Sequence, residues 1–235
     1  MLLEVSNLTA GYGFLKVLWG ISFYIDRGEF VALIGPNGAG KSTTLKSISG
    51  LLPPNSGTIS FNGSVINNLD CAVNCRNGLS YISEELNLFT GMTVLENLEM
   101  GGQILNDSDK MKENLSFVFE LFPRLEERVE QYAGTLSGGE RKMLAIARGL
   151  MSNPVMVLVD EPSLGLAPQV TEEVFSALRV LNKKGVTILL VEQNVTKTLK
   201  FSSRAYILEK GQIVLEGKSS DLISNDHVKK IYLGT

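Results

Sequence analysis

The chain has 235 residues, of which 44% are hydrophobic and 20% charged, and it carries 22 basic and 25 acidic side chains for a formal net charge of −3. This length suits one large α/β domain or one domain with a subdomain. The acidic balance argues against a nucleic-acid partner, which would require a basic surface. Because the apolar runs are too short to span a bilayer and the N-terminus lacks a signal-peptide pattern, we expect a cytosolic protein, or one held at a membrane by a partner.

The sequence pattern of the first quarter of the chain predicts mainly strands. Residues 2–6, 19–25 and 58–63 have strand patterns, and the turn at 26–29 leads into an apolar strand at 30–34. We expect the early strands to form an antiparallel layer beside the core. Residues 10–13 predict a loop in which Tyr12 lies between glycines. Its ring is either ordinary packing or a stacking platform for a purine.

A glycine-rich loop follows the apolar strand and opens into a helix. Its residues are Gly35, Pro36, Asn37, Gly38, Ala39, Gly40, Lys41, Ser42 and Thr43, at the G-x-x-x-x-G-K-S spacing. The glycines let backbone N–H groups turn inward toward anionic oxygens, and the helix N-terminus adds its positive dipole. Lys41 can then reach outer phosphates, while the Ser42 hydroxyl can bind Mg²⁺. The alternative is a glycine-rich turn with a chance lysine, but the flanking strand and helix favour a nucleoside triphosphate site.

The middle of the chain is predicted to be mainly helical. A short strand at 79–84 ends at Glu84, Thr93 and Glu96 have capping-box spacing, and a helix from Ser108 has one apolar face before Pro123. Ser137, Gly138 and Gly139 then begin another helix. They form either a second anion-binding arrangement or a plain helix cap with loose glycines.

The last third predicts apolar strands alternating with helices, which is typical of a parallel sheet covered on both faces. The strand at 155–159 ends in Asp160 and Glu161, and the strand at 186–191 leads to Gln193. Asp160 is the candidate Mg²⁺ ligand, and Glu161 the candidate base that activates water. A hairpin at 206–209 and 212–216 follows.

The cysteines and the histidine are not expected to bind metal. Cys71 and Cys75 stand four residues apart, and two ligands do not close a zinc site. We expect free thiols in a reducing compartment. His227 lies in the polar stretch 225–230, where a solvated surface histidine is expected.

Together, these motifs resemble those of the ATP-binding cassette (ABC) ATPases over nearly the whole chain. Residues 35–43 resemble Walker A, residues 155–161 resemble Walker B with its glutamate, and residues 136–140 match the family signature. The resemblance implies an α/β P-loop NTPase fold with a mostly parallel core, an antiparallel β subdomain and a helical subdomain. Residues 1–235 would form one ABC ATPase domain, with a core at 1–84 and 152–235 and a helical signature subdomain at 85–151.

The resemblance also implies a head-to-tail dimer that binds ATP and Mg²⁺ between subunits. Ser137, Gly138 and Gly139 of one subunit would contact the ATP held at Lys41 of the other. Tyr12 matches the aromatic residue that stacks on adenine. The implied catalytic residues are Glu161, Gln193 and Glu84, and the implied metal ligands are Ser42, Asp160 and Glu84.

Three positions depart from the general ABC pattern. Glu84 replaces a glutamine, Gln193 replaces the switch histidine, and Leu166 replaces an aspartate. A glutamine can hydrogen-bond a phosphate oxygen but, unlike histidine, it cannot take up a proton or carry a full charge, so these changes would fit slow turnover or a degenerate site.

Four stretches, at 17–21, 160–168, 187–194 and 228–234, resemble the ATP-binding subunits of branched-chain amino acid importers. In that subfamily the glutamate and glutamine belong to an active pattern, although residues 85–87 differ from its usual glycine and arginines.

This closer resemblance implies an ATPase that powers import of branched-chain or hydrophobic amino acids. Its partners would be a second cassette, integral membrane permeases and an extracytoplasmic substrate-binding protein, without nucleic acid. The protein would sit on the cytoplasmic side of the cell membrane through the permeases. The alternatives are the same ATPase role for another cargo, such as urea, an amide or a lipid-linked substrate, and a slow-turnover ATP-binding regulatory module.

Overall fold

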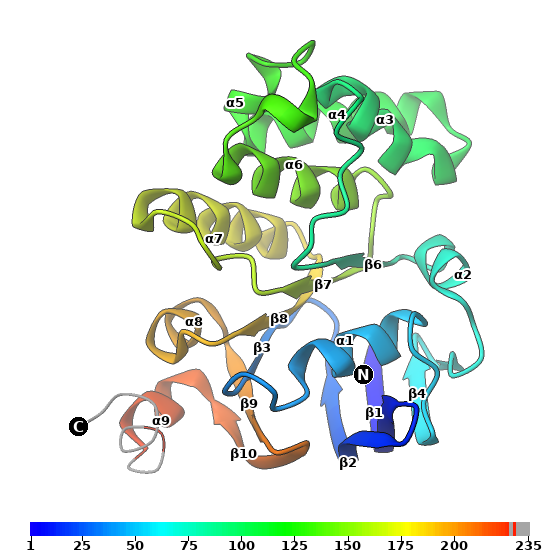
Figure 1. The fold of residues 1–235 in the computed structure, drawn as a ribbon, viewed down its shortest axis with the longest axis vertical. Coiled ribbons are helices and arrows are strands. Elements are labelled where there is room, and N and C mark those ends of the chain that lie inside the picture. The colour runs from blue at the N-terminus through cyan, green and yellow to red at the C-terminus, as the bar shows by residue number, and fades with distance from the viewer. Residues whose placement is uncertain (226–227, 229–235) are drawn as a thin grey trace.

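The computed structural model describes residues 1–225 and 228, so the predicted histidine environment at 227 lies outside the described residues (Figure 1). The strands are β1 (Leu3–Tyr12), β2 (Leu15–Ile25), β3 (Phe30–Ile34), β4 (Ser56–Phe61), β5 (Ser64–Val65), β6 (Leu79–Ile82), β7 (Met156–Asp160), β8 (Thr187–Glu192), β9 (Arg204–Glu209) and β10 (Gln212–Lys218). The α-helices are α1 (Lys41–Ser49), α2 (Cys71–Arg76), α3 (Val94–Gly102), α4 (Ser108–Leu121), α5 (Pro123–Glu126), α6 (Gly138–Leu150), α7 (Pro168–Lys183), α8 (Val195–Phe201) and α9 (Ser219–Ser224).

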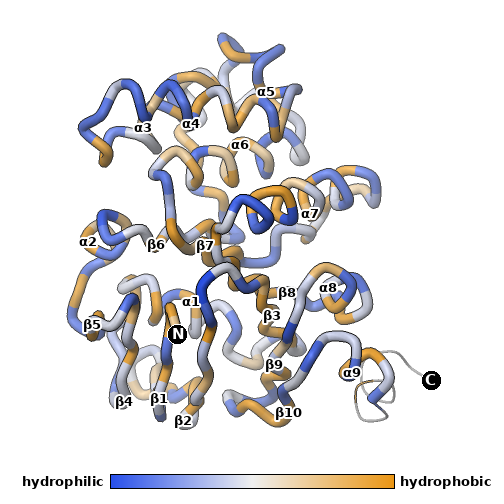
Figure 2. The backbone as a smooth tube through the Cα atoms, turned by 180° about the vertical axis from the view of Figure 1, so that it is seen from behind, coloured by the Kyte–Doolittle hydropathy of each residue, from blue (hydrophilic) through white to orange (hydrophobic). Residues whose placement is uncertain are grey.

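A six-stranded sheet in the order β10-β9-β3-β8-β7-β6 forms the core. The strands from β9 to β6 are parallel, and β10 joins the edge as the antiparallel partner of β9. β3, β7 and β8 are buried along their whole length, as their continuous apolar sequences predicted. Figure 2 shows these hydrophobic strands in the middle of the molecule. The parallel sheet covered on both faces is therefore confirmed.

The N-terminal strands form a separate sheet in the order β2-β1-β4-β5, whose paired strands are antiparallel. The predicted loop at 10–13 was wrong, because β1 continues to Tyr12 and pairs it with Leu15. Gly11 interrupts the apolar alternation without breaking the strand. A Cβ at that position would lie 2.0 Å from the Leu15 carbonyl oxygen, so glycine permits the close approach of the two strands.

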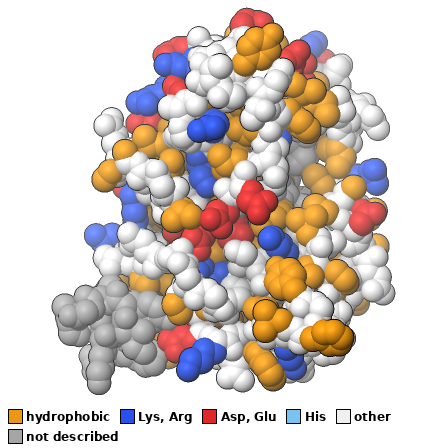
Figure 3. All heavy atoms as spheres, in the orientation of Figure 1, with side chains coloured by type: hydrophobic (Ala, Val, Ile, Leu, Met, Phe, Trp, Pro, Cys, Tyr) orange, Lys and Arg blue, Asp and Glu red, His pale blue; other side chains and the backbone are white. Residues whose placement is uncertain are grey.

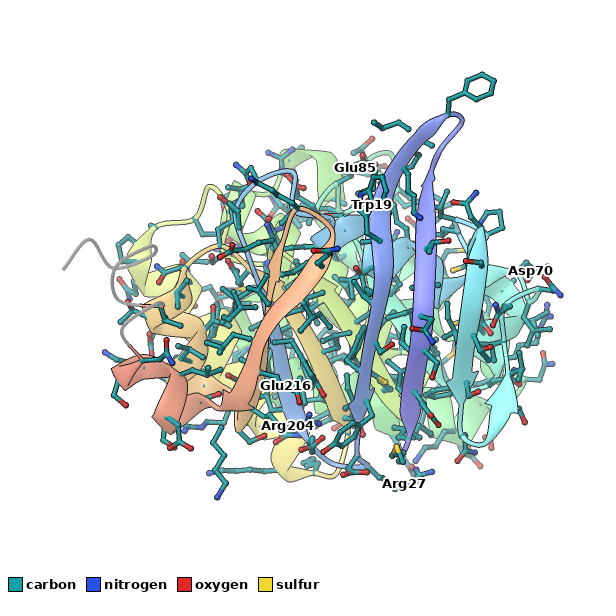
Figure 4. All side chains as sticks on the ribbon, turned by 90° about the horizontal axis from the view of Figure 1, so that it is seen from below. Trp19, Arg27, Asp70, Glu85, Arg204 and Glu216 are labelled. Carbon is teal, nitrogen blue, oxygen red and sulfur yellow. The ribbon has the colours of Figure 1, made fainter. Side chains whose placement is uncertain are left out.

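The edges of the two sheets meet beside the turn between β9 and β10. The backbone N–H of Trp19 on β2 donates to the carbonyl oxygen of Gly211 at 2.9 Å. A Cβ on Gly211 would lie 1.9 Å from the Val17 carbonyl oxygen, and its φ of 75° also favours glycine. Figure 4 shows β2, with Trp19 labelled, running beside β10. This contact fixes the β1–β2 hairpin against the core.

The apolar core extends over both faces of the six-stranded sheet. One hydrophobic cluster joins α1 and the antiparallel sheet to one face of the six-stranded sheet. A second cluster covers the opposite face and includes α6, α7 and the helices from α3 to α5. The second cluster is continuous from the helical part to β7 and β8. Because this packing runs unbroken from the helical part into the core, the helical subdomain at residues 85–151 stays a prediction. Within the described residues, none of the helices is both long enough and apolar enough to cross a membrane.

The helix signals in the sequence were accurate in the middle of the chain. Thr93 and Glu96 form a reciprocal capping box at the start of α3, as predicted. α4 begins at Ser108 with Asp107 as its cap, and Pro123 both ends the apolar stripe and begins α5. Cys71 and Cys75 are free thiols on α2, and the described part of the chain contains no group of three or more histidine, cysteine, aspartate or glutamate side chains that could hold a metal ion.

Candidate functional site

The glycine-rich loop connects the buried strand β3 to α1. Gly40 is the N-cap of α1 with a φ of 107°, and Gly38 has a φ of 78°, both in the left-handed region that glycine tolerates. A Cβ on Gly35 would lie 2.2 Å from the Leu208 carbonyl oxygen on β9. The glycine positions are thus set by backbone conformation and by close packing. The resulting loop presents N–H groups at a helix N-terminus, which favours anion binding.

Lys41 points into this site and is only 4% exposed. Its Nζ lies 3.1 Å from Glu161 Oε1 and donates to the Pro36 carbonyl oxygen at 3.2 Å. A buried ammonium requires such partners, because desolvation without pairing is costly. Phosphate oxygens entering the loop would compete with the Glu161 carboxylate for the same ammonium. The loop lysine and the carboxylate that follows β7 are therefore brought together, as the sequence predicted.

Asp160, at the end of β7, accepts two hydrogen bonds. Ser42 Oγ donates to Asp160 Oδ1 at 3.0 Å, and the Tyr81 hydroxyl donates to Asp160 Oδ2 at 3.0 Å. Burial raises the pKa of Asp160 above its ordinary value, and the charges of Glu161 and Glu84 add to this, against the two hydrogen bonds. A divalent cation would reverse this effect. Adjacent hydroxyl and carboxylate oxygens fit Mg²⁺, which takes few protein ligands and completes its shell with phosphate and water.

Glu161 adopts a left-handed backbone conformation with a φ of 44°. Its N–H donates to the Val191 carbonyl oxygen at 2.9 Å, which ties the turn to β8. Its carboxylate accepts from Gln193 Nε2 and pairs with Lys41. A non-glycine residue in this region is uncommon and is held by its surroundings. The turn thus directs the Glu161 carboxylate toward the phosphate loop, and its role as the catalytic base stays a prediction.

These groups line one cleft of about 630 Å³. Its lining brings together Tyr12, Leu15, Val17, Asn37, Gly38, Gly40, Lys41, Ser42, Thr43, Glu84, Glu161, Leu164 and Gln193. Tyr12 is 47% exposed at the end of β1, so its ring is accessible from the cleft. Figure 3 shows acidic side chains gathered near the middle of the face that it draws. Glu84, Gln193 and Tyr12 are therefore near the loop, as the resemblance implied.

The signature lies elsewhere, at the start of α6. Ser137 Oγ accepts from the Glu140 N–H at 3.3 Å, and the Glu140 carboxylate accepts from the Ser137 N–H at 2.9 Å. Ser137 and Gly138 are exposed, and neither belongs to the lining of the Lys41 cleft among the described residues. The helix cap, one of the two alternatives for this segment, is therefore present, and it does not exclude anion binding at the same helix end. Contact with a second subunit's nucleotide stays a prediction.

Glu140 also secures this cap by an ion pair. Its Oε1 lies 2.8 Å from Arg128 Nε. Burial alone would raise the pKa of Glu140, but the hydrogen bonds from Ser137 and the Arg128 charge outweigh it and hold the pKa below its ordinary value. The carboxylate is thus ionised at neutral pH, which maintains both the capping box and the ion pair.

Sequence reasoning missed three polar side chains at the site. Tyr81 reaches Asp160 from the neighbouring strand, and buried Glu192 accepts from the Ser163 N–H at 2.9 Å. Lys142, on the second turn of α6, donates from Nζ to the Glu161 carbonyl oxygen at 3.3 Å. For Lys142, the available sequence signal was a lysine on an otherwise apolar helix face, which indicates a buried charge with a specific partner. Which strand neighbours β7 was not readable from local sequence.

Comparison with known proteins agrees with this geometry. A family model described as ABC transporter matches residues 18–164. The high-affinity branched-chain amino acid transport ATP-binding protein BraG of Pseudomonas aeruginosa is 43% identical over 233 residues, covering 99% of this chain and 100% of that protein. The lipopolysaccharide export system ATP-binding protein LptB of Escherichia coli is 32% identical, covering 99% and 97%.

A solved structure supports the same assignment. The ADP conformation of an ATP-binding cassette of an ABC transporter superposes with a TM-score of 0.85 at 30% identity, covering 100% of this chain and 99% of that one. The family model, the relatives and the solved structure agree on one family. The chain therefore belongs to the ABC transporter family, as a nucleotide-binding ATPase subunit.

Proposed function

We propose that this protein hydrolyses ATP to power an importer of branched-chain or other hydrophobic amino acids. The observation that carries the proposal is its 43% identity to BraG over the whole chain. Glu84 and Gln193, which depart from the general ABC pattern, both line the Lys41 cleft, and Gln193 hydrogen-bonds the Glu161 carboxylate. These contacts support an active site built with a glutamine in place of a histidine.

The proposed chemistry assigns a role to each group in the cleft. The loop N–H groups and Lys41 bind the phosphates of ATP, and Tyr12 stacks on adenine. Ser42 and Asp160, with Glu84, would hold Mg²⁺, which neutralises phosphate charge when bound. Glu161 accepts a proton from the attacking water, and Gln193 orients the Glu161 carboxylate by donating to one of its oxygens. Positioning and electrostatics supply most of the rate enhancement in such reactions.

A second cassette would complete the site. Ser137, Gly138 and Gly139 stand at the N-terminus of α6, where backbone N–H groups and the helix dipole favour an anion. Exposure of Ser137 and Gly138 leaves them available to the γ-phosphate of ATP bound to another subunit. Two ATP molecules would then bridge a head-to-tail dimer, made of two copies or of this chain and a related one, and hydrolysis would remove the bridge.

A groove between α2, β6, α3 and α6 is the proposed contact with the permeases. It measures about 620 Å³, and its lining includes Leu51, Leu86, Phe89, Met100 and Ile104. Arg148 donates to the carbonyl oxygens of Leu86 and Asn87 at 2.9 and 2.7 Å, which holds these left-handed residues in place. An apolar groove of this kind suits a helix from a membrane subunit. The protein would thus sit on the cytoplasmic side of the membrane, served by an extracytoplasmic binding protein.

The test is transport by the assembled system. The protein is reconstituted in liposomes with permease subunits and a leucine-binding protein from the same source, and ATP-dependent uptake of radiolabelled leucine is measured. Leucine uptake that is lost in the Glu161→Gln variant supports the proposal. ATP hydrolysis without uptake of leucine, isoleucine or valine would refute the cargo and leave the ATPase role intact.

The full-length similarity to LptB supports a second candidate, an ATPase of the same design that moves a lipid-linked substrate. The cassette does not contact cargo, so its own cleft does not separate the two. The membrane partners separate the two candidates. A permease pair with a substrate-binding protein would indicate import, whereas partners that extract lipid from the bilayer would indicate export. Stimulation of ATP turnover by leucine-loaded binding protein would exclude the lipid candidate.

A further inference from the structure

Lys142 is a buried cation that the proposed chemistry does not use. It is 4% exposed on α6 and donates from Nζ to the backbone carbonyl oxygen of Glu161 at 3.3 Å. The neighbouring positions of α6 from Met143 to Ala147 are apolar and buried. Charged side chains are almost never fully buried unless they are paired. A lysine in this environment therefore calls for a specific partner, and the Glu161 turn provides it.

The charges of several carboxylates act on the Lys142 ammonium. Burial holds the pKa of Lys142 below its ordinary value, and the charges of Glu84, Glu192, Asp160 and Glu161, which favour the protonated form, offset only part of this effect. Lys41 is the other buried lysine in this region, and it pairs with the Glu161 side chain. The two lysines thus contact different parts of the same residue, one at its carboxylate and one at its carbonyl oxygen.

The turn that Lys142 contacts has a backbone conformation that needs support from its surroundings. Glu161 has a φ of 44°, and its carbonyl oxygen accepts from both Lys142 Nζ and the Leu164 N–H, each at 3.3 Å. Such a backbone conformation costs free energy and persists only where neighbouring groups fix it. A shift in this turn would move the carboxylate away from the phosphate loop. Small displacements of a catalytic base reduce the rate strongly.

Lys142 also links this turn to the signature. Ser137, the cap of α6, stands five residues before Lys142 on the same helix. A rigid helix therefore connects the residue proposed to contact the second subunit's ATP with the residue that contacts the Glu161 turn. Movement of α6 toward a partner would change the position of Lys142 and, through it, of Glu161.

We propose that Lys142 is a positioning residue for ATP hydrolysis, which holds the Glu161 turn and couples its orientation to the position of α6. The inference rests on the proposed role of Glu161 as the base. Lys142 does not belong to the lining of the Lys41 cleft, where ATP and the attacking water are proposed to bind. Its effect is therefore on turnover and not on nucleotide binding.

The test compares Lys142→Met with wild type in steady-state ATP hydrolysis with Mg²⁺. Methionine keeps an unbranched side chain, one heavy atom shorter, and removes the charge and the donor. We expect kcat to fall about tenfold or more, the cost of losing a charge-assisted hydrogen bond, while KM for ATP changes less than about twofold. Lys142→Arg, which keeps both charge and donor, should recover most of the loss. Lys183→Met, at an exposed position near the end of α7, is the matched control and should leave kcat unchanged.

A double-mutant cycle separates positioning from general structural damage. If Lys142 acts through Glu161, Lys142→Met should change the residual turnover of the Glu161→Gln variant by less than about twofold. A tenfold loss in both backgrounds, or wild-type kcat in Lys142→Met, would overturn the inference. Should Lys142→Met prove insoluble, Lys142→Gln enters the same cycle. Wild-type turnover in Glu161→Gln would instead refute the assigned base, so the two failures are distinguishable.

Discussion

Replacing Tyr81 with phenylalanine should weaken the fold by a measurable and calculable amount. The substitution removes only the hydroxyl that donates to Asp160 Oδ2 at 3.0 Å and leaves the buried carboxylate with its Ser42 contact. Burial and the Asp160 charge raise the pKa of Tyr81, so the hydroxyl stays protonated and available as a donor at neutral pH. A hydrogen bond to a charged group contributes about 1.5–3 kcal/mol to stability.

For a chain of this length, 1 kcal/mol corresponds to about 2–4 °C in Tm, so we expect Tyr81→Phe to lower Tm by about 3–12 °C. Differential scanning calorimetry without nucleotide measures this directly. Tyr132→Phe, at an exposed tyrosine, is the control and should leave Tm within about 1 °C, as for ordinary surface substitutions. An unchanged Tm in Tyr81→Phe would refute the assignment of this hydroxyl to Asp160.

Three further predictions concern other parts of the site. Tyr12→Ala should raise KM for ATP by about fivefold or more, because a stacking contact contributes about 1–3 kcal/mol, while Tyr12→Phe should retain it; equal KM values would contradict adenine stacking. Because folding lowers the pKa of Glu140, its carboxylate stabilises the fold fully at pH values above the ordinary pKa of 4.5. This contribution is lost as the pH falls through the lower pKa of the folded protein. Glu140→Gln should therefore be less stable than wild type at pH 7, with a difference that shrinks below pH 4.5 in urea unfolding; a difference independent of pH would argue against this. Gly35→Ala should destabilise the fold by about 1–3 kcal/mol, since its Cβ would lie 2.2 Å from a backbone oxygen, whereas Gly91→Ala, where a Cβ meets nothing, should be neutral in the same assay.

The parts of the site that lie on contiguous residues were predictable from sequence. The phosphate loop combines three glycines, a lysine and a hydroxyl within one strand-to-helix connection, so local spacing carries the chemistry. Asp160 and Glu161 were found because a buried strand ends there, where ligands of α/β sheets bind. The caps at Thr93 and Ser137 were likewise local patterns.

The parts that depend on packing between distant segments were not predictable. Tyr81 reaches Asp160 because β6 is the parallel neighbour of β7, and strand order is not encoded in periodicity. Lys142 reaches Glu161 because α6 packs against the sheet at this point. The length of β1 was underestimated because Gly11 has a strand conformation that its propensity disfavours. In each case tertiary contact overrode or extended the local signal.

The measurement that tests the central claim most directly is Mg²⁺-dependent ATP turnover by the purified protein and its Glu161→Gln variant. The account predicts hydrolysis by the wild type and a loss of about 100-fold or more in the variant, as expected when a general base is removed. ATP binding should persist in the variant, because Lys41 and the loop N–H groups are retained. Wild-type turnover in Glu161→Gln, or no hydrolysis by the wild type with its membrane partners, would contradict the account.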